Sequence, residues 1–327
     1  MDRALGEHAR PRRRRTGGSR LLRCAAWSVV VAGAAAPLAR RRLPLPAPAV
    51  LGAAWSAPAA LCVAVPRTPA RDVGTVGLQM WAYINAYAMP NDDPPALRGR
   101  VRIDYPIAGD RAIGLGVLPG VRLQRGLGTP GRINGFEKPL VWAHWIWFFV
   151  PHGTVAYILL HHRDRFPRAA VMTYAVFDLG ALVYWAVPTA PPWYAAQAGR
   201  IGETGDQAQM RRMMTEYGRQ FWGDLWDHLY GLLGGNPLAA MPSLHFATSV
   251  TAAHLLAELG PVEGAIGWGY AVTLGVALVY LGEHYVVDLL AGLALTEAVR
   301  ALEPHAAPAL RAFSCGVRAL EARARGA

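Results

Sequence analysis

Long apolar runs, separated by short polar or glycine-rich breaks, dominate the hydropathy pattern of this 327-residue chain. An α-helix rises 1.5 Å per residue, so about twenty apolar residues cross the roughly 30 Å of hydrocarbon in a bilayer. Runs of about this length cover residues 47–65, 139–160, 169–187, 243–259, 265–281 and 286–302. The pattern therefore predicts an all-α fold, a polytopic membrane helix bundle with six core transmembrane helices.

A seventh apolar segment, residues 24–39, is shorter and contains Pro37. The positive-inside rule places the arginine-rich segment 161–168 and the tail after Arg300 in the cytoplasm. Counting spans backward from these two points, we expect residues 24–39 to be re-entrant or peripheral. If that segment spanned the membrane, the arginine cluster at residues 12–15 would lie outside the cell.

These assignments divide the chain into three parts. A basic N-terminal arm covers residues 1–45, a membrane domain covers residues 46–302 and a cytoplasmic tail covers residues 303–327. Within the membrane domain, residues 67–138 and 188–240 form external regions with amphipathic helices. Glycine and proline punctuation in the first of these regions is typical of irregular chain with short helical pieces.

The second external region contains a stripe of apolar residues. Its members recur at steps of mostly three and four residues: Met210, Met213, Met214, Tyr217, Phe221, Leu225 and Leu232. This spacing predicts an amphipathic helix. With Trp222 and Trp226 beside it, the helix either lies in the headgroup layer over a site of lipid access or packs on the external ends of the bundle.

Composition supports the membrane assignment, since 53% of the residues are hydrophobic and only 17% are charged, unlike an ordinary soluble enzyme. The formal net charge is +11, and residues 1–71 hold 13 arginines against Asp2 and Glu7. A basic arm beside apolar segments more often faces the anionic cytoplasmic leaflet than nucleic acid. We therefore expect the membrane bilayer as a partner and no nucleic acid. The three cysteines are far apart, which argues against a disulfide framework or a zinc finger.

Two polar clusters lie beside the predicted spans, where ionisable side chains are costly and therefore functional candidates. The first is Met-Pro-Ser-Leu-His at residues 241–245. Pro242 suits the first turn of a helix, because its missing N–H has no intrahelical partner there. Ser243 and His245 then lie at a helix N-terminus, whose free N–H groups and positive dipole end suit a phosphate oxyanion.

The second cluster contains His284 and Asp288, four residues apart. On a helix the two side chains share a face, so the carboxylate can hold one imidazole nitrogen and leave the other free to attack. His245 opens one predicted span and His284 closes the next, which places both histidines on the external side. Such a spacing alone is usually a satisfied polar pair, but together the clusters indicate phosphoryl transfer that needs no metal and no cofactor.

The other histidines favour a structural interpretation. His144 and His152 lie on an apolar span, where a satisfied buried imidazole is more usual than a ligand. His254 lies nine residues after His245 on the same predicted helix but on a different face, which weakens a metal-binding pair.

These residues resemble the signatures of the phosphatidic acid phosphatase type 2 superfamily of membrane lipid phosphatases and phosphotransferases. Residues 241–245 are similar to its second signature, and His284 with Asp288 is similar to the core of its third. The segment Pro-Thr-Ala-Pro-Pro-Trp-Tyr at residues 188–194 is similar to a segment of the inositol phosphorylceramide synthase branch. The resemblance covers the chain from about residue 139 to residue 302.

The resemblance implies that His284 is the nucleophile and forms a phosphohistidine, that Asp288 orients it, and that His245 is the general acid for the leaving alkoxide. Ser243 would help to hold the phosphate. The substrate would be a lipid phosphate or a phospholipid head group, and the acceptor would be water, a polyol such as inositol, or another lipid. We therefore expect an integral membrane enzyme with its active site on the extracytoplasmic face of the plasma membrane.

Three departures from the family pattern bear on how the phosphate is held. The first signature, a lysine followed seven residues later by Arg-Pro, is missing, because the only lysine is Lys138 and residue 145 is tryptophan. Leu244 replaces the usual glycine of the second signature, and the Ser-Arg pair before the third is absent. Among the arginines of the second external region we prefer Arg211 and Arg212 as phosphate-binding residues, because a guanidinium fork suits phosphate.

Two other classes of function stay open at this stage. His245, His284 and Asp288 also form a two-His, one-carboxylate set that suits zinc or iron. One tightly bound ion per chain, with activity abolished by chelation, would favour such a metalloprotein. A non-catalytic lipid carrier would bind phosphate without turnover, so equal phosphate release by wild type and His284→Ala would favour a carrier.

Overall fold

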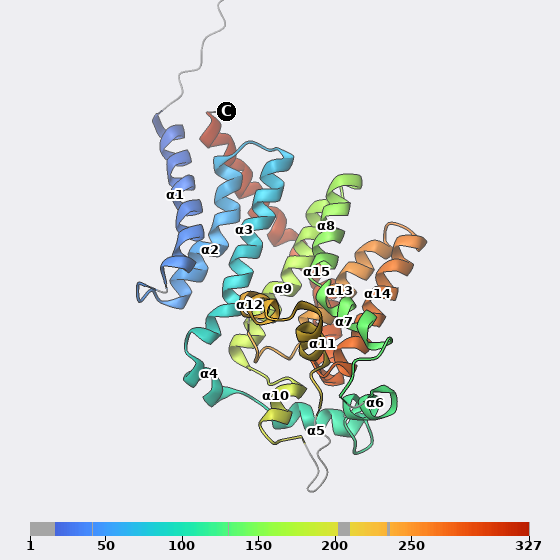
Figure 1. Cartoon of the computed structure of the whole chain (residues 1–327). Helices are drawn as coiled ribbons and strands as arrows, with labels where there is room; N and C mark the ends of the chain where they lie inside the picture. The colour runs from blue at the N-terminus through green and yellow to red at the C-terminus, as the bar shows by residue number, and fades with distance from the viewer. Residues whose placement is uncertain (1–16, 41, 130, 202–209, 234–235, 327) are drawn as a thin grey trace, which may run out of the picture. The chain divides into compact units, whose positions relative to one another are not determined.

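The computed structural model of the chain describes residues 17–40, 42–129, 131–201, 210–233 and 236–326 (Figure 1). All regular elements in these residues are helices, and the isolated β-bridges between them form no strand. The prediction of an all-α fold is therefore confirmed. The first sixteen residues of the predicted basic arm lie outside the described residues.

The chain divides into two compact units, of which the first comprises Met1–Ala82 and Ala306–Ala327. Its described part contains α1 (Gly17–Ala39), α2 (Ala47–Ala64), most of α3 (Pro69–Ala88) and the last part of α15 (Val286–Arg325). Helices α1 and α2 lie side by side (Figure 1). Gly33 permits this contact, since a Cβ there would lie 2.6 Å from the carbonyl oxygen of Ala53.

The second unit, Tyr83–His305, holds the remaining elements. Its first elements after α3 are η1 (Met89–Asp92), α4 (Pro94–Arg100), α5 (Asp104–Ile113) and α6 (Pro119–Leu127). The middle of the unit contains α7 (Glu137–Trp145), α8 (Phe149–His161), α9 (Phe166–Ala186), α10 (Pro192–Gln197), α11 (Met213–Trp222) and α12 (Leu225–Leu233). The last elements are α13 (Leu244–Ala257), α14 (Pro261–Tyr280) and the first part of α15.

Four helices of the described chain are long and apolar enough to cross a membrane, namely α1, α2, α9 and α14. The pair α7 and α8 passes the same test together but is bent by 55° at its break. Helix α13 is apolar but has only 14 residues. The chain is thus an integral membrane protein with four or five candidate spans in its described part. The six core spans stay a prediction, as does the peripheral placement of residues 24–39, because α1 is itself long enough to span.

The predicted span at residues 139–160 is interrupted by a turn at residues 146–148. Pro151 explains the break, because its ring fits the first turn of α8 but would press against the carbonyl of Trp147 in a continuous helix. The indole Nε1 of Trp147 donates a hydrogen bond to Oγ1 of Thr248 at 3.0 Å. The break therefore places a tryptophan of the α7–α8 pair against α13.

The predicted amphipathic helix of the second external region is two helices, α11 and α12, separated at Gly223, whose φ of 56° favours glycine. Part of the apolar stripe packs on the bundle in one buried cluster: Met213, Met214, Tyr217 and Trp226 with Val141 of α7 and Tyr280 of α14. Phe221 and Leu225 are exposed instead. The first part of the stripe therefore packs on the ends of the bundle. The side chain of Leu232 lies outside the described residues.

Helix α13 packs against α8, α9 and α14. Gly180 of α9 permits a close approach, since a Cβ there would lie 2.4 Å from the Leu244 side chain. Tyr184, one turn further along α9, donates its hydroxyl to the carbonyl of Pro242 at 2.7 Å. These contacts fix the start of α13, which carries the first predicted cluster.

Candidate active site

The two predicted histidines face each other at the starts of α13 and α15. His245 is the second residue of α13, and His284 lies two residues before α15. Nδ1 of His245 lies 3.1 Å from Nε2 of His284, and the ring planes are inclined by 63°. The structure therefore brings together two imidazoles that are 39 residues apart in the chain, as the sequence predicts.

Asp288 lies behind His284. Its Oδ2 is 3.2 Å from Nδ1 of His284 and also accepts the backbone N–H of Tyr285 at 2.9 Å. The Asp288 side chain is fully buried, and that of His284 is 5% exposed. Because a carboxylate only accepts hydrogen bonds, His284 donates through Nδ1 and keeps a lone pair on Nε2. The nitrogen with this lone pair is the one that faces His245.

Ser243 is buried between the starts of the same two helices. Its Oγ accepts the N–H of Phe246 at 3.3 Å as the N-cap of α13, and its own N–H donates to the carbonyl of Asp288 at 2.9 Å. The hydroxyl thus stabilises the helix start, where the first-turn N–H groups of Leu244 and His245 precede the intrahelical hydrogen bonds. A direct contact between Ser243 and phosphate stays a prediction.

Small residues let α15 approach the start of α13. A Cβ at Gly292 would lie 2.6 Å from the carbonyl oxygen of Ser243, a backbone atom that cannot easily move aside. One turn further, Thr296 donates its hydroxyl to the carbonyl of Ala247 at 2.8 Å. Because His245 lies on α13 and Asp288 on α15, this contact sets the distance between the two halves of the site.

Two aromatic residues of the α7–α8 pair complete the surroundings of His245. The ring of His144 stacks on His245 with centroids 4.9 Å apart, and the ring of Trp147 lies 4.2 Å away. Nδ1 of His144 is buried without a hydrogen-bond partner among the described residues. His144 thus lies against His245, and its interpretation as a structural histidine stays a prediction. Hydropathy carried no signal for this placement, because the break in the helix decides which side chains meet His245.

Arg212 contacts Glu283, the residue before His284. Its Nε donates to Oε1 of Glu283 at 3.0 Å, and Nη2 donates to the hydroxyl of Tyr230 at 2.6 Å. The guanidinium carbon lies 3.8 Å from the centroid of the Trp193 ring. Burial on its own lowers the pKa of Arg212, but Glu283 and Tyr230 together raise that pKa more, so the guanidinium stays charged.

Arg211, the other predicted phosphate-binding arginine, makes different contacts. Its Nε donates to Oε1 of Glu216 at 3.1 Å, and Nη1 donates to the carbonyl of Thr129 at 2.8 Å. The hydrogen bond to Glu216 raises the pKa of Arg211. The structure thus brings Arg212, rather than Arg211, to the segment that carries His284.

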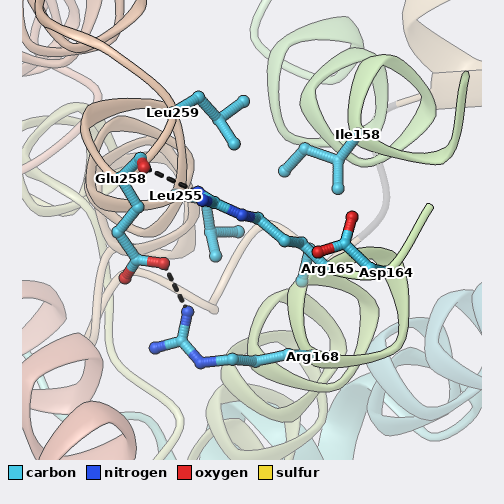
Figure 2. Close-up of a pocket in the computed structure, with 8 residues that line it drawn as sticks. Ile158, Asp164, Arg165, Arg168, Leu255, Glu258 and Leu259 are labelled. Atoms are coloured by element: carbon cyan, nitrogen blue, oxygen red, sulfur yellow. Dashed lines mark hydrogen bonds and ion pairs between the residues drawn. The ribbon is translucent and has the colours of Figure 1, made fainter. Parts of the chain in front are cut away.

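A pocket of about 380 Å³ lies at the other end of α13 (Figure 2). Arg165 donates to the backbone carbonyl of Glu258 at 2.6 Å, and Arg168 donates to the Glu258 carboxylate at 2.6 Å. The 14 residues of α13 correspond to about 21 Å of helix. This pocket is therefore separate from the two histidines.

The histidines and Asp288 form a hydrogen-bonded chain, in which Nδ1 of His284 is bonded to the carboxylate and its Nε2 faces His245. Within the part of the chain that the structure describes, no group of three or more His, Cys, Asp and Glu side chains is arranged to hold a metal ion. The hydrogen-bonded chain of these three residues suits proton transfer and nucleophilic attack.

Comparison with protein families matches residues 135–302 to the PAP2 superfamily, the phosphatidic acid phosphatase type 2 proteins. This match covers just over half of the chain and includes His245, His284 and Asp288. The chain belongs to the PAP2 superfamily. The resemblance inferred from the two sequence clusters is therefore confirmed.

Two curated relatives of this PAP2 protein carry the names of synthases. The chain is similar to inositol phosphorylceramide synthase catalytic subunit aur1 of Schizosaccharomyces pombe, with 25% identity over 172 residues, which are 51% of this chain and 37% of the relative. It is also similar to phosphoinositol dihydroceramide synthase of Bacteroides thetaiotaomicron, with 29% identity over 144 residues, which are 40% of this chain and 43% of the relative. The chain thus matches less than half the length of either relative. No solved structure matches the chain at a significant level.

Proposed function

We propose that this PAP2 protein is an integral-membrane lipid phosphatase or phosphotransferase that uses a phosphohistidine intermediate on His284. The observation that carries the proposal is the hydrogen-bonded chain from Asp288 through His284 to His245. A nucleophile oriented by a carboxylate and a second imidazole that handles the proton are the groups that such a reaction requires. The family match supports a phosphate ester of a lipid as the substrate class.

In the first half-reaction, a lipid phosphate enters between the two imidazoles and replaces their hydrogen bond, and Nε2 of His284 attacks its phosphorus. A P–N bond forms while the bond from phosphorus to the lipid oxygen breaks, and the electron pair leaves with that oxygen. His245 donates a proton to the oxygen, so the leaving group departs as a neutral alcohol. Asp288 stabilises the positive charge that develops on His284.

In the second half-reaction, a hydroxyl group attacks the phosphohistidine. His245, now deprotonated, accepts the proton of this hydroxyl while a P–O bond forms and the P–N bond breaks. Both histidines return to their starting states. Water as the nucleophile makes the protein a phosphatase, whereas a polyol such as inositol or a lipid alcohol makes it a transferase.

Arg212 is the residue that we assign to the cationic clamp of the phosphate. Glu283 binds Nε and Nη2 of Arg212, and the guanidinium lies over the ring of Trp193. The charge is therefore held next to the segment that carries His284, where Nη1 can donate to a phosphate oxygen. The first-turn N–H groups and the positive dipole end of α13 favour an anion at the same place. Arg212 thereby supplies the charge that the missing first signature leaves unassigned.

The names of the relatives support a transferase that handles phosphoinositol. One relative is named for inositol phosphorylceramide and the other for phosphoinositol dihydroceramide. For this chain we propose the transfer of a phosphoryl or phosphoinositol group between a phospholipid and an alcohol, with hydrolysis as the competing outcome.

The two ends of α13 support an active site on the extracytoplasmic face of the plasma membrane. Arg165 and Arg168 bond to Glu258 just after the end of α13, and the positive-inside rule assigns this arginine-rich side to the cytoplasm. His245 lies at the opposite end of the same helix. We therefore propose that the reaction takes place on the external side.

The test of this function follows a labelled phosphorus atom. Purified protein in lipid vesicles receives phosphatidylinositol labelled on phosphorus, with and without dihydroceramide, and labelled phosphatidic acid, with and without inositol. We expect wild type to move the label to an alcohol or to water and His284→Ala to move none. Equal product from both proteins would refute the catalytic role, and the identity of the labelled product separates a transferase from a phosphatase.

A further inference from the structure

The first turn of α15 begins directly after a tyrosine. Helix α15 starts at Val286, so Tyr285 occupies the position where serine, threonine, asparagine or aspartate usually offers an oxygen to the first-turn N–H groups. A tyrosine hydroxyl is too far from its own backbone to do this. Asp288 accepts the N–H of Tyr285, which is half of a capping box. The N–H groups of Val286 and Val287 therefore need an acceptor from elsewhere.

That acceptor is Asp110 on α5, which lies 176 residues before Val286 in the chain. Its Oδ2 accepts the N–H of Val286 at 3.0 Å, and its Oδ1 accepts the N–H of Val287 at 2.9 Å. The residue is only 1% exposed. A carboxylate at this place also complements the positive dipole end of α15. Two carboxylates, Asp110 and Asp288, thus hold three successive backbone N–H groups.

We propose that Asp110 is a positioning residue of the reaction, which fixes the first turn of α15 and thereby the geometry of the His284–Asp288 pair. This inference rests on the proposed function. Val286 and Val287 lie between His284 and Asp288 in the chain, so a shift of their backbone changes the distance from imidazole to carboxylate. A misplacement of about 1 Å can cost about 100-fold in rate.

The packing around Asp110 supports this role. A Cβ at the neighbouring Gly109 would lie 2.8 Å from Cγ1 of Val287, so α5 approaches α15 as closely as a glycine allows. Tyr285 is buried in an apolar cluster with residues of α5 and α6, which keeps water away from the two hydrogen bonds. Asp110 lies outside the family match at residues 135–302, in the external region to which the sequence assigns no role.

The first test compares Asp110→Asn with Asp104→Asn, a matched control on α5 whose side chain is 70% exposed. The introduced amide keeps one acceptor oxygen but turns an NH₂ group toward the other backbone N–H. With labelled phosphatidylinositol in vesicles, we expect Asp110→Asn to lower kcat about 10- to 100-fold and to change KM less than about threefold. Asp104→Asn should change neither constant. A wild-type kcat for Asp110→Asn would overturn the inference.

A second variant, Val286→Pro, removes one donor without touching a carboxylate. Proline suits the first position of a helix, so α15 should still form. We expect Val286→Pro to lower kcat. The double variant with Asp110→Asn should have a kcat no lower than that of Asp110→Asn alone, because the introduced proline has no N–H that would face the NH₂ group of the introduced amide. A fall in kcat of the double variant equal to the product of the two single decreases would contradict the inference. If Asp110→Asn does not fold, wild-type activity of Val286→Pro alone contradicts it.

The variant His284→Ala, measured in parallel, separates failure of this inference from failure of the proposed function. If the proposed function is wrong, His284→Ala keeps wild-type turnover. If only the positioning role is wrong, His284→Ala is inactive while Asp110→Asn and Val286→Pro keep wild-type turnover.

Discussion

His245 and His284 are 3.1 Å apart, yet their surroundings differ. The Nδ1–H of His284 is held by a buried carboxylate, which leaves the lone pair of this imidazole on Nε2. His245 instead lies against the rings of His144 and Trp147. From this difference between the two residues we propose attack by His284 and proton transfer by His245.

The assignment predicts a leaving-group effect for His245→Ala. Loss of the proton donor should lower the turnover of lipid phosphates by about 100-fold or more, because their alkoxides are poor leaving groups. An activated aryl phosphate needs little protonation, so its turnover should fall by less than about tenfold. Steady-state kcat values for the two substrates test this prediction. Equal losses with both would argue against a general acid at this position.

The two neighbouring arginines provide a matched pair for the phosphate clamp. We expect Arg212→Ala to lower kcat/KM about 100-fold, because a charge aimed at the phosphate is lost. Arg211→Ala removes a guanidinium that bonds to Glu216 and Thr129 instead, so kcat/KM should change less than about threefold. Measurements of kcat/KM with phosphatidic acid test which arginine binds the phosphate. A larger decrease for Arg211→Ala than for Arg212→Ala would contradict the assignment of the clamp to Arg212.

Local spacing was enough to predict some site residues but not others. Ser243 with His245 forms a recognisable helix start, and His284 with Asp288 forms a four-residue pair, so both clusters are visible in the sequence. His144 and Asp110 meet their partners across about 100 residues or more, through a helix break and a helix end. No short motif encodes such contacts, because the packing of other elements creates them.

At the scale of elements, the site depends on how closely α15 approaches α13. A side chain at Gly292 would collide with the carbonyl of Ser243, so Gly292→Ala should push the two helix starts apart. We expect about a tenfold or larger drop in kcat, since small misplacements of reacting groups are costly. Gly269→Ala on α14 is the control, because a Cβ there meets nothing within 4 Å. Unchanged turnover of Gly292→Ala, measured with its unfolding midpoint, would show that the contact is not limiting.

Hydropathy predicted where helices occur better than where they stop. The run at residues 139–160 is mostly apolar, yet Pro151 divides it into α7 and α8. The stripe along α11 and α12 has helical spacing, yet Gly223 adopts a positive φ between them. In both cases a single backbone-specific residue overrides a periodic pattern, so the helix class was predictable and the geometry of the break was not.

For the whole molecule, we predict that the tail and the second external region lie on opposite sides of the membrane. In a background without the native cysteines, Gln197→Cys in α10 should react with a membrane-impermeant maleimide in intact cells. A single cysteine retained at Cys315, which is exposed near the end of α15, should react only after lysis. The reverse pattern would place the histidines on the cytoplasmic face.

Composition and hydropathy predicted a membrane protein, but they do not fix the number of spans. Helix α13 has 14 residues, a length that suits either a buried core helix or part of a span. Helix α1 is long and apolar enough to cross, although the charge pattern favours a peripheral place. The position of these helices depends on lipid and on neighbouring helices, which hydropathy alone does not report.

The most direct measurement is the detection of a phosphorylated histidine during turnover. Wild-type protein is mixed with a lipid substrate labelled on phosphorus, quenched at alkaline pH and digested, and the labelled peptide is identified by mass spectrometry. We predict label on the peptide that contains His284, and none on that peptide in His284→Ala. Turnover without any label there, or equal labelling in His284→Ala, would contradict a phosphohistidine intermediate on His284.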